Sequence, residues 1–189
     1  MMKIIAIALL SVITPLAEAH TGVAQYGFMS GLAHPFLGLD HLLAMLAVGI
    51  WAGKMGGKAS WHIPLAFIVI MAISALFSQG LASMPLIENG IAVSLLLLGL
   101  FIVLAIKLPV AMGMIVVSLF AVFHGVAHGV ELPVAASPLW YVSGFVLATA
   151  LLHATGVIAA ASRTDKSLVI VRLTGALIAT TGGFMLLAS

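Results

Sequence analysis

The sequence contains no cysteine, which excludes disulfide bonds, thiolate metal ligands and cysteine-bound iron–sulfur clusters. Charge is also scarce, because Lys, Arg, Asp and Glu together make up only 6% of the 189 residues. A soluble domain of this size would need a far more polar surface. The net charge of +2 comes without a basic patch that could bind nucleic acid. A G-x4-GK[ST] phosphate-binding motif is missing as well, so we expect no ATP hydrolysis by this chain.

Hydrophobic residues make up 63% of the chain and fall into six long apolar segments. Runs of about 20 apolar residues are typical of helices that span a membrane. We therefore predict an all-α membrane protein whose single domain, residues 20–189, is a six-helix transmembrane bundle. Its first residues, 20–33, form a glycine-rich lead-in. Short connections lead us to expect consecutive helices as antiparallel neighbours. The expected spans lie near residues 34–53, 61–82, 87–106, 109–129, 138–161 and 168–187.

Residues 1–19 have the three parts of a cleavable signal peptide. Lys3 supplies the positive start, residues 4–13 the apolar stretch, and Ala17-Glu18-Ala19 the cleavage motif. The alternative is an uncleaved anchor helix, although ten apolar residues are too few to cross a bilayer core of roughly 30 Å. Cleavage would make His20 the first residue of the mature protein.

The basic residues predict how the bundle is oriented. If the mature N-terminus is outside, all of those beyond the signal lie on one side of the membrane, while the loops 83–86 and 130–137 have none. Positive charge favours the cytoplasmic side, so both mature termini are expected outside. The basic residues in question are Lys54, Lys58, Lys107, Arg163, Lys166 and Arg172.

The segment 109–129 ends in a group of residues that could bind metal. His124, His128 and Glu131 fall within a sector of about 60° on one helix face, at 100° per residue. Two imidazoles and a carboxylate suit a borderline divalent metal such as Ni²⁺, Zn²⁺ or Co²⁺. Alternatively, the histidines only form hydrogen bonds at the helix end.

The segment 34–53 begins with a second such group. Pro35 suits a first helical turn, and His34 and His41 share a face if one helix includes both. Asp40 is a direct metal ligand, an acceptor that orients a ligating histidine, or a structural hydrogen-bonding group. Ionisable residues in membrane segments are costly and mark ion or proton paths.

The two groups are expected at similar depth, about 6–8 Å inside the outer helix ends at 1.5 Å per residue. We therefore expect one outer site. His153, which lies deeper in the segment 138–161, is either a further station on an inward path or a packed histidine. His20 could chelate through its amine and imidazole, whereas His62 is expected at the inner interface.

Glycines spaced four apart should allow helices to approach closely. Gly49 and Gly53 form one such pair, and Gly125 and Gly129 form another. A faint similarity between the segments 34–53 and 109–129 also suggests an inverted repeat of three helices per half, as in many transporters.

These residues resemble the HupE/UreJ family, membrane proteins associated with nickel supply to hydrogenase and urease. The pattern HP-x2-G-x-DH-x-L-x-M-x2-VG is met by His34, Pro35, Gly38, Asp40, His41, Leu43, Met45, Val48 and Gly49. The pattern FHG-x-AHG-x-E is met by Phe123, His124, Gly125, Ala127, His128, Gly129 and Glu131. The spacing H-x5-DH differs from the H-x4-DH of the nickel–cobalt permeases, whose geometry is therefore not transferred.

The resemblance implies uptake of a divalent metal by a secondary permease in the bacterial cytoplasmic membrane, not an enzyme. Ni²⁺ is favoured, with Co²⁺, Zn²⁺ and Cu²⁺ as alternatives, and no prosthetic group is expected. Two rival functions use the same histidines: an intramembrane zinc hydrolase, and a haem protein with two histidine axial ligands. The expected partners are lipid and the metal ion, and the resemblance adds a link to hydrogenase or urease metal supply.

Overall fold

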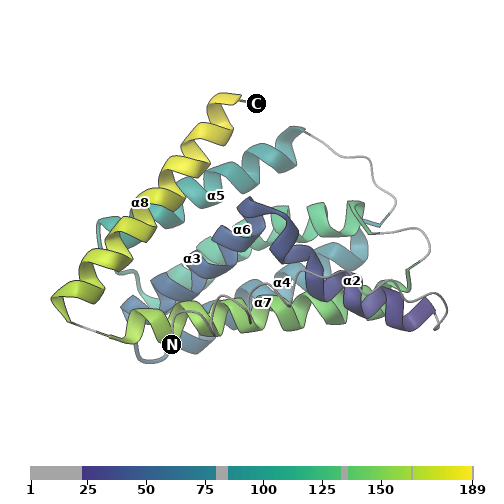
Figure 1. Ribbon diagram of the computed structural model, residues 1–189, viewed down its shortest axis with the longest axis horizontal. Helices are drawn as coiled ribbons and strands as arrows, with labels where there is room; N and C mark the ends of the chain where they lie inside the picture. Colours follow the sequence, from purple (N-terminus) through teal and green to yellow (C-terminus); the bar gives the residue numbers. More distant parts are fainter. Residues whose placement is uncertain (1–22, 80–84, 133–135, 163, 189) are drawn as a thin grey trace, which may run out of the picture.

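The computed structural model describes residues 23–79, 85–132, 136–162 and 164–188, and all regular structure in these ranges is α-helical (Figure 1). The predicted signal peptide and His20 lie outside the described residues. The helices are α2 (Val23–Leu37), α3 (Leu39–Met55), α4 (Ala59–Phe77), α5 (Pro85–Val103), α6 (Val110–Val130), α7 (Pro138–Ala161) and α8 (Asp165–Ala188).

Five of these helices, α4 to α8, are each long and apolar enough to cross a membrane. The helices α2 and α3 meet the same test together but are bent by 84° at their junction. The described chain therefore has five candidate spans, or six if the bent pair is one span. The prediction of an all-α protein with several membrane-spanning helices is confirmed at this level.

The prediction of one helix over residues 34–53 is wrong, because the helix is interrupted at Gly38. This residue has an extended backbone, with φ −102° and ψ 119°. Pro35 lies in the last turn of α2 rather than in the first turn of a helix. Since proline has no N–H and its ring crowds the preceding turn, it favours termination of a helix soon afterwards. The expected lead-in of residues 20–33 is itself helical from Val23 onward.

Consecutive helices are not always neighbours, contrary to the prediction from short connections. The most extensive contacts join α4 to α6, α5 to α8, and α7 to both α2 and α3. Among the described residues, α4 makes little or no contact with α5, and the same is true of α6 and α7. In Figure 1, α5 and α8 lie together along one side of the molecule, while α2 and α7 lie along another. Packing of helix faces, rather than loop length, decides these pairs.

Small residues make the closest helix pairs possible, as the glycine spacing predicted. A side chain at Gly49 would collide with the backbone of His153 on α7. One at Gly125 would collide with the backbone of Met71 on α4. The contacts of Gly53 and Gly129 continue in the same direction along α7 and α4. Therefore α3 runs parallel to α7, and α6 runs parallel to α4, as spans that alternate in direction require.

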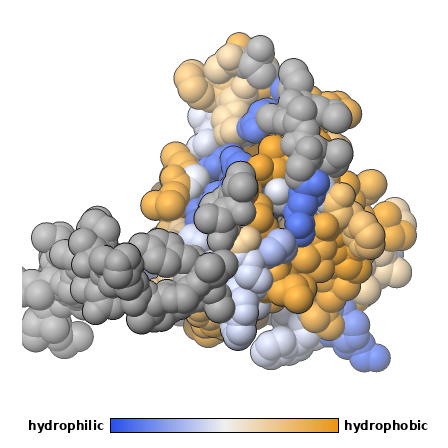
Figure 2. Space-filling model, turned by 90° about the vertical axis from the view of Figure 1, so that its right-hand side faces the viewer, coloured by the Kyte–Doolittle hydropathy of each residue, from blue (hydrophilic) through white to orange (hydrophobic). Residues whose placement is uncertain are grey.

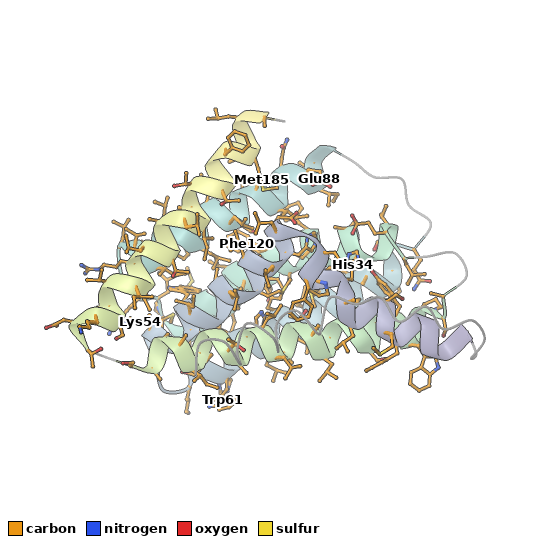
Figure 3. All side chains as sticks on the ribbon, viewed as in Figure 1. His34, Lys54, Trp61, Glu88, Phe120 and Met185 are labelled. Carbon is orange, nitrogen blue, oxygen red and sulfur yellow. The ribbon has the colours of Figure 1, made fainter. Side chains whose placement is uncertain are left out.

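Most charged residues of the described chain lie in the terminal turns of helices or next to them. His34 and Lys54 lie toward opposite ends in Figure 3, with Trp61 at the end where Lys54 lies. Figure 2 looks onto the opposite end and shows hydrophilic residues gathered between hydrophobic flanks. His34 and the end of α6, which is capped by Glu131, lie toward this end.

Candidate metal centre

The last two turns of α6 carry two of the predicted ligands, and its C-cap carries a third. His124 and His128 are fully buried, and Glu131 caps the helix with its side chain 49% exposed. The i, i+4, i+7 spacing places all three on the face of α6 that is turned toward α2 and α3. The carboxylate therefore stands at the surface, and the two imidazoles follow it inward.

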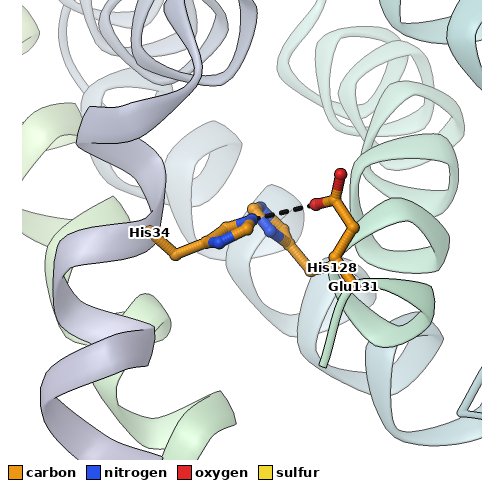
Figure 4. A group of neighbouring side chains, drawn as sticks. All are labelled: His34, His128 and Glu131. Carbon is orange, nitrogen blue, oxygen red and sulfur yellow. Dashed lines mark hydrogen bonds and ion pairs between the residues drawn. The ribbon is translucent and has the colours of Figure 1, made fainter. Parts of the chain in front are cut away.

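His34 reaches this group from α2 (Figure 4). Its Nε2 lies 3.0 Å from Glu131 Oε2, and its side chain is 23% exposed. One ligand atom from each of His34, His128 and Glu131 lies within 4.8 Å of the other two. Residues 97 positions apart in the chain thus present two imidazoles and a carboxylate to one point.

Asp40 and His41, in the first turn of α3, form a second contact. Asp40 Oδ1 lies 3.0 Å from His41 Nδ1, and a neutral imidazole donates from this nitrogen to the carboxylate. The lone pair is then on His41 Nε2, which is buried and has no hydrogen-bond partner. The geometry of Asp40 is that of an acceptor that orients a ligating histidine.

His124 and His128 likewise have nitrogen atoms without a partner. His124 Nδ1 donates to the backbone oxygen of Phe120 at 3.0 Å, while its Nε2 has no partner. Neither ring nitrogen of His128 has one. Buried polar atoms in proteins are almost always hydrogen-bonded. Several imidazole nitrogens without partners, close together, are ligands that suit a transition metal.

Ring contacts join all four histidines into one cluster. The ring centroids of His41 and His128 are 4.6 Å apart, and those of His34 and His128 are 4.9 Å apart. His124 lies 5.4 Å from His41 by the same measure. The two groups expected at similar depth are therefore in contact. Of the other predicted ligands, Asp40 contacts this cluster only through its bond to His41 among the described contacts. His153 lies deeper, beside Phe67.

The electrostatics at the surface favour an ionised carboxylate. The hydrogen bond from His34 lowers the pKa of Glu131 below its ordinary value, against the opposing effect of burial. Glu131 therefore offers a negative charge to a cation arriving from outside the bundle.

Comparison with known proteins gives the same family as the motifs. The HupE / UreJ protein family matches residues 7–186. Protein HupE of Rhizobium leguminosarum bv. viciae is 41% identical over 172 residues, which are 90% of each chain. The chain belongs to the HupE / UreJ family. No solved structure matches this chain.

In this HupE / UreJ protein, α7 forms a wall of the site that sequence reasoning missed. The Tyr141 ring lies 5.8 Å from that of His34, and the Phe145 ring stacks on His128 at 4.7 Å. Both residues are buried, and Tyr141 Oη has no hydrogen-bond partner. The signal was present, since Tyr141, Phe145, Thr149 and His153 follow one another at intervals of four in an apolar helix.

Proposed function

We propose that this chain is a secondary permease that carries a divalent transition metal, most favourably Ni²⁺, into the cell. Membership of the HupE / UreJ family supports a membrane protein associated with the transport of nickel or another metal. The observation that carries the proposal is the convergence of four histidines and Glu131 from α2, α3 and α6, with buried imidazole nitrogens that have no partner.

The proposed outer site consists of His34, Asp40, His41, His124, His128 and Glu131. Glu131 and His34, which are bonded to each other, separate to accept the ion at the surface. The imidazoles of His41, His124 and His128 then replace its water, and Asp40 orients His41. Neutral imidazoles and one carboxylate match the ligand preference of Ni²⁺, Co²⁺, Zn²⁺ and Cu²⁺.

The direction of transport follows from the membrane potential. With the outer site on the periplasmic side of the cytoplasmic membrane, a potential negative inside favours uptake of a 2+ ion by roughly 4–5 kcal/mol per 100 mV. The orientation rests on the basic residues at the opposite end of the bundle. The family gives general support to an accessory or transport role rather than an enzyme, and it suggests hydrogenase or urease as the destination of the metal.

Reconstituted uptake tests the proposal. Proteoliposomes of the wild type should take up Ni²⁺ under an inside-negative potential, with Co²⁺, Zn²⁺ and Cu²⁺ as competitors. The variant His41→Ala should lose at least about 90% of this uptake, since a ligand and its oriented lone pair disappear together. His62→Ala is the matched control, because His62 is exposed and bonded to Lys58 O at the other end of the bundle. Unchanged Ni²⁺ uptake by His41→Ala would refute the proposed site.

A further inference from the structure

We propose a second, inner station for the same metal, formed by Thr149 and His153 beyond the outer site. This inference rests on the proposed function, because it assigns the next step of the same path. It adds Thr149 as a ligand, and it makes Phe67 the barrier that separates the two stations.

Thr149 and His153 are buried polar residues that have no structural explanation. Both ring nitrogens of His153 and the hydroxyl of Thr149 lack a hydrogen-bond partner, and the two side chains are 1% and 0% exposed. A leucine and a valine would fill the same space without burying unpaired polar atoms, which destabilise the fold. The fold would therefore be more stable with apolar residues at these two positions. A ligand that pairs with Thr149 and His153 explains why the destabilising polar groups are present.

The hydroxyl of Thr149 differs from other helical threonine hydroxyls of the described chain. Four of these donate to the carbonyl four residues earlier, at 2.8–3.0 Å: Thr155, Thr174, Thr180 and Thr181. A threonine in a helix commonly makes this bond, but Thr149 does not. Its oxygen therefore keeps its lone pairs for another group, and His153, one turn later, lies on the same face of α7.

The inner residues lie in line with the outer site. On the same row of α7, Tyr141 contacts His34 and Phe145 stacks on His128. From α4, the Phe67 ring meets both His124 and His153 edge-on, at centroid distances of 5.5 and 5.3 Å. His124, a member of the outer cluster, and His153 thus contact the same Phe67 ring.

The ligand set suits a station from which an ion must leave. An imidazole and a hydroxyl are neutral, and the described carboxylates of the site, Asp40 and Glu131, stand at its outer end. A conducting path needs sites that bind well enough to fill and weakly enough to release. We therefore expect the inner station to bind a divalent metal more weakly than the outer site.

The test uses the full chain with Ni²⁺ alone as the probe. Equilibrium dialysis in detergent should give two Ni²⁺ per wild-type chain at saturation and one for His153→Leu, whose remaining site keeps its affinity within about twofold. Uptake by His153→Leu should fall at least about tenfold. Thr149→Val, which keeps the shape and removes the hydroxyl, should lower uptake about three- to tenfold. Matched controls are His62→Leu and Thr155→Val, both exposed positions that should behave as wild type.

The outcomes separate this inference from the proposed function. If wild-type proteoliposomes take up Ni²⁺ and His153→Leu takes it up within about twofold of the wild-type rate, the inner station is overturned and the permease stays intact. Loss of outer-site affinity and of thermal stability in both His153→Leu and Thr149→Val would make these residues structural and also overturn it. Wild-type proteoliposomes that take up no Ni²⁺ would refute the permease, and the inner station with it.

Discussion

Glu131 and His34 are bonded to each other at the surface of the candidate site. Each is partly exposed, and their 3.0 Å bond joins the end of α6 to the end of α2. In the proposed function, an arriving cation replaces this bond with a bond to each of the two residues.

We expect Glu131→Gln to weaken Ni²⁺ binding at least about tenfold, because the amide has no negative charge and is a poor ligand for a divalent metal. The glutamine oxygen still accepts from His34, so the melting temperature should stay close to that of the wild type. Isothermal titration and thermal melting of the same preparation check both points. The exposed Glu88→Gln, in the first turn of α5, is the control.

Metal affinity should fall as the pH drops below about 6, because imidazoles bind metal only when neutral. The pKa of Glu131 is lowered by the hydrogen bond from His34, so its charge persists to a lower pH than that of an ordinary glutamate. Glu131→Gln should therefore weaken binding at every pH in this range while the fall at acid pH persists. Titrations from pH 5 to 8 measure this, and a midpoint that disappeared with Glu131 would assign the pH dependence to the carboxylate instead.

Asp40→Asn should reduce Ni²⁺ affinity about 10- to 100-fold, the usual effect of removing the group that orients a ligating histidine. The amide cannot hold the proton on His41 Nδ1 as a carboxylate does. Ni²⁺ titration measures the loss, and X-ray absorption tells whether the bound ion has lost an imidazole or a carboxylate. An oxygen ligand lost with all imidazoles retained would make Asp40 a direct ligand.

At the scale of elements, the bend at Gly38 decides which histidines meet. In an unbroken helix His34 and His41 would be about 10.5 Å apart along the axis. After the 84° bend their ring centroids are 6.1 Å apart, and both rings contact His128. The three donors meet because the helix ends between them.

The α4–α6 contact positions His124 and His128, and it depends on Gly125. Gly125→Ala should lower the melting temperature clearly, since the added carbon would overlap the backbone of Met71. Gly183→Ala is a matched control on α8, where the same carbon meets nothing within 4 Å. In a helix that change alone is mildly stabilising. Equal melting temperatures for the two variants would mean that the helices do not approach as described.

At the scale of the whole molecule, the basic residues and the candidate site occupy opposite ends of the bundle. Lys54 lies in the last turn of α3, Lys58 caps the start of α4 and Lys107 lies between α5 and α6, all on one side. Glu131, at the end of α6, lies on the other side. The parallel and antiparallel helix pairs agree with spans that alternate in direction.

The absence of cysteine permits a direct test of orientation. In intact cells, Gln79→Cys should react with a membrane-impermeant maleimide, while Lys107→Cys should react only after the membrane is opened. Both positions are exposed and lie next to helix ends on opposite sides. The reverse pattern would place the site on the cytoplasmic face and make the protein an exporter or a releasing gate.

The class of the protein and the identity of its candidate ligands follow from the sequence alone. Apolar runs long enough to cross a bilayer, and the cost of charge within them, are local properties that need no folded structure to be recognised. The spacing of His124, His128 and Glu131 is local in the same sense, because one helix turns them to one face.

Only the tertiary structure decided which helices are neighbours and where the first span breaks. Loop length predicted neighbours wrongly, because the length of a connection does not decide which face the next helix packs against. Glycine faces such as those of α3 and α6 instead select α7 and α4. The wall formed by Tyr141 and Phe145 depends on that choice. His34 contacts Glu131, 97 residues away, across two helices. The spacing of residues within either helix cannot predict such a contact.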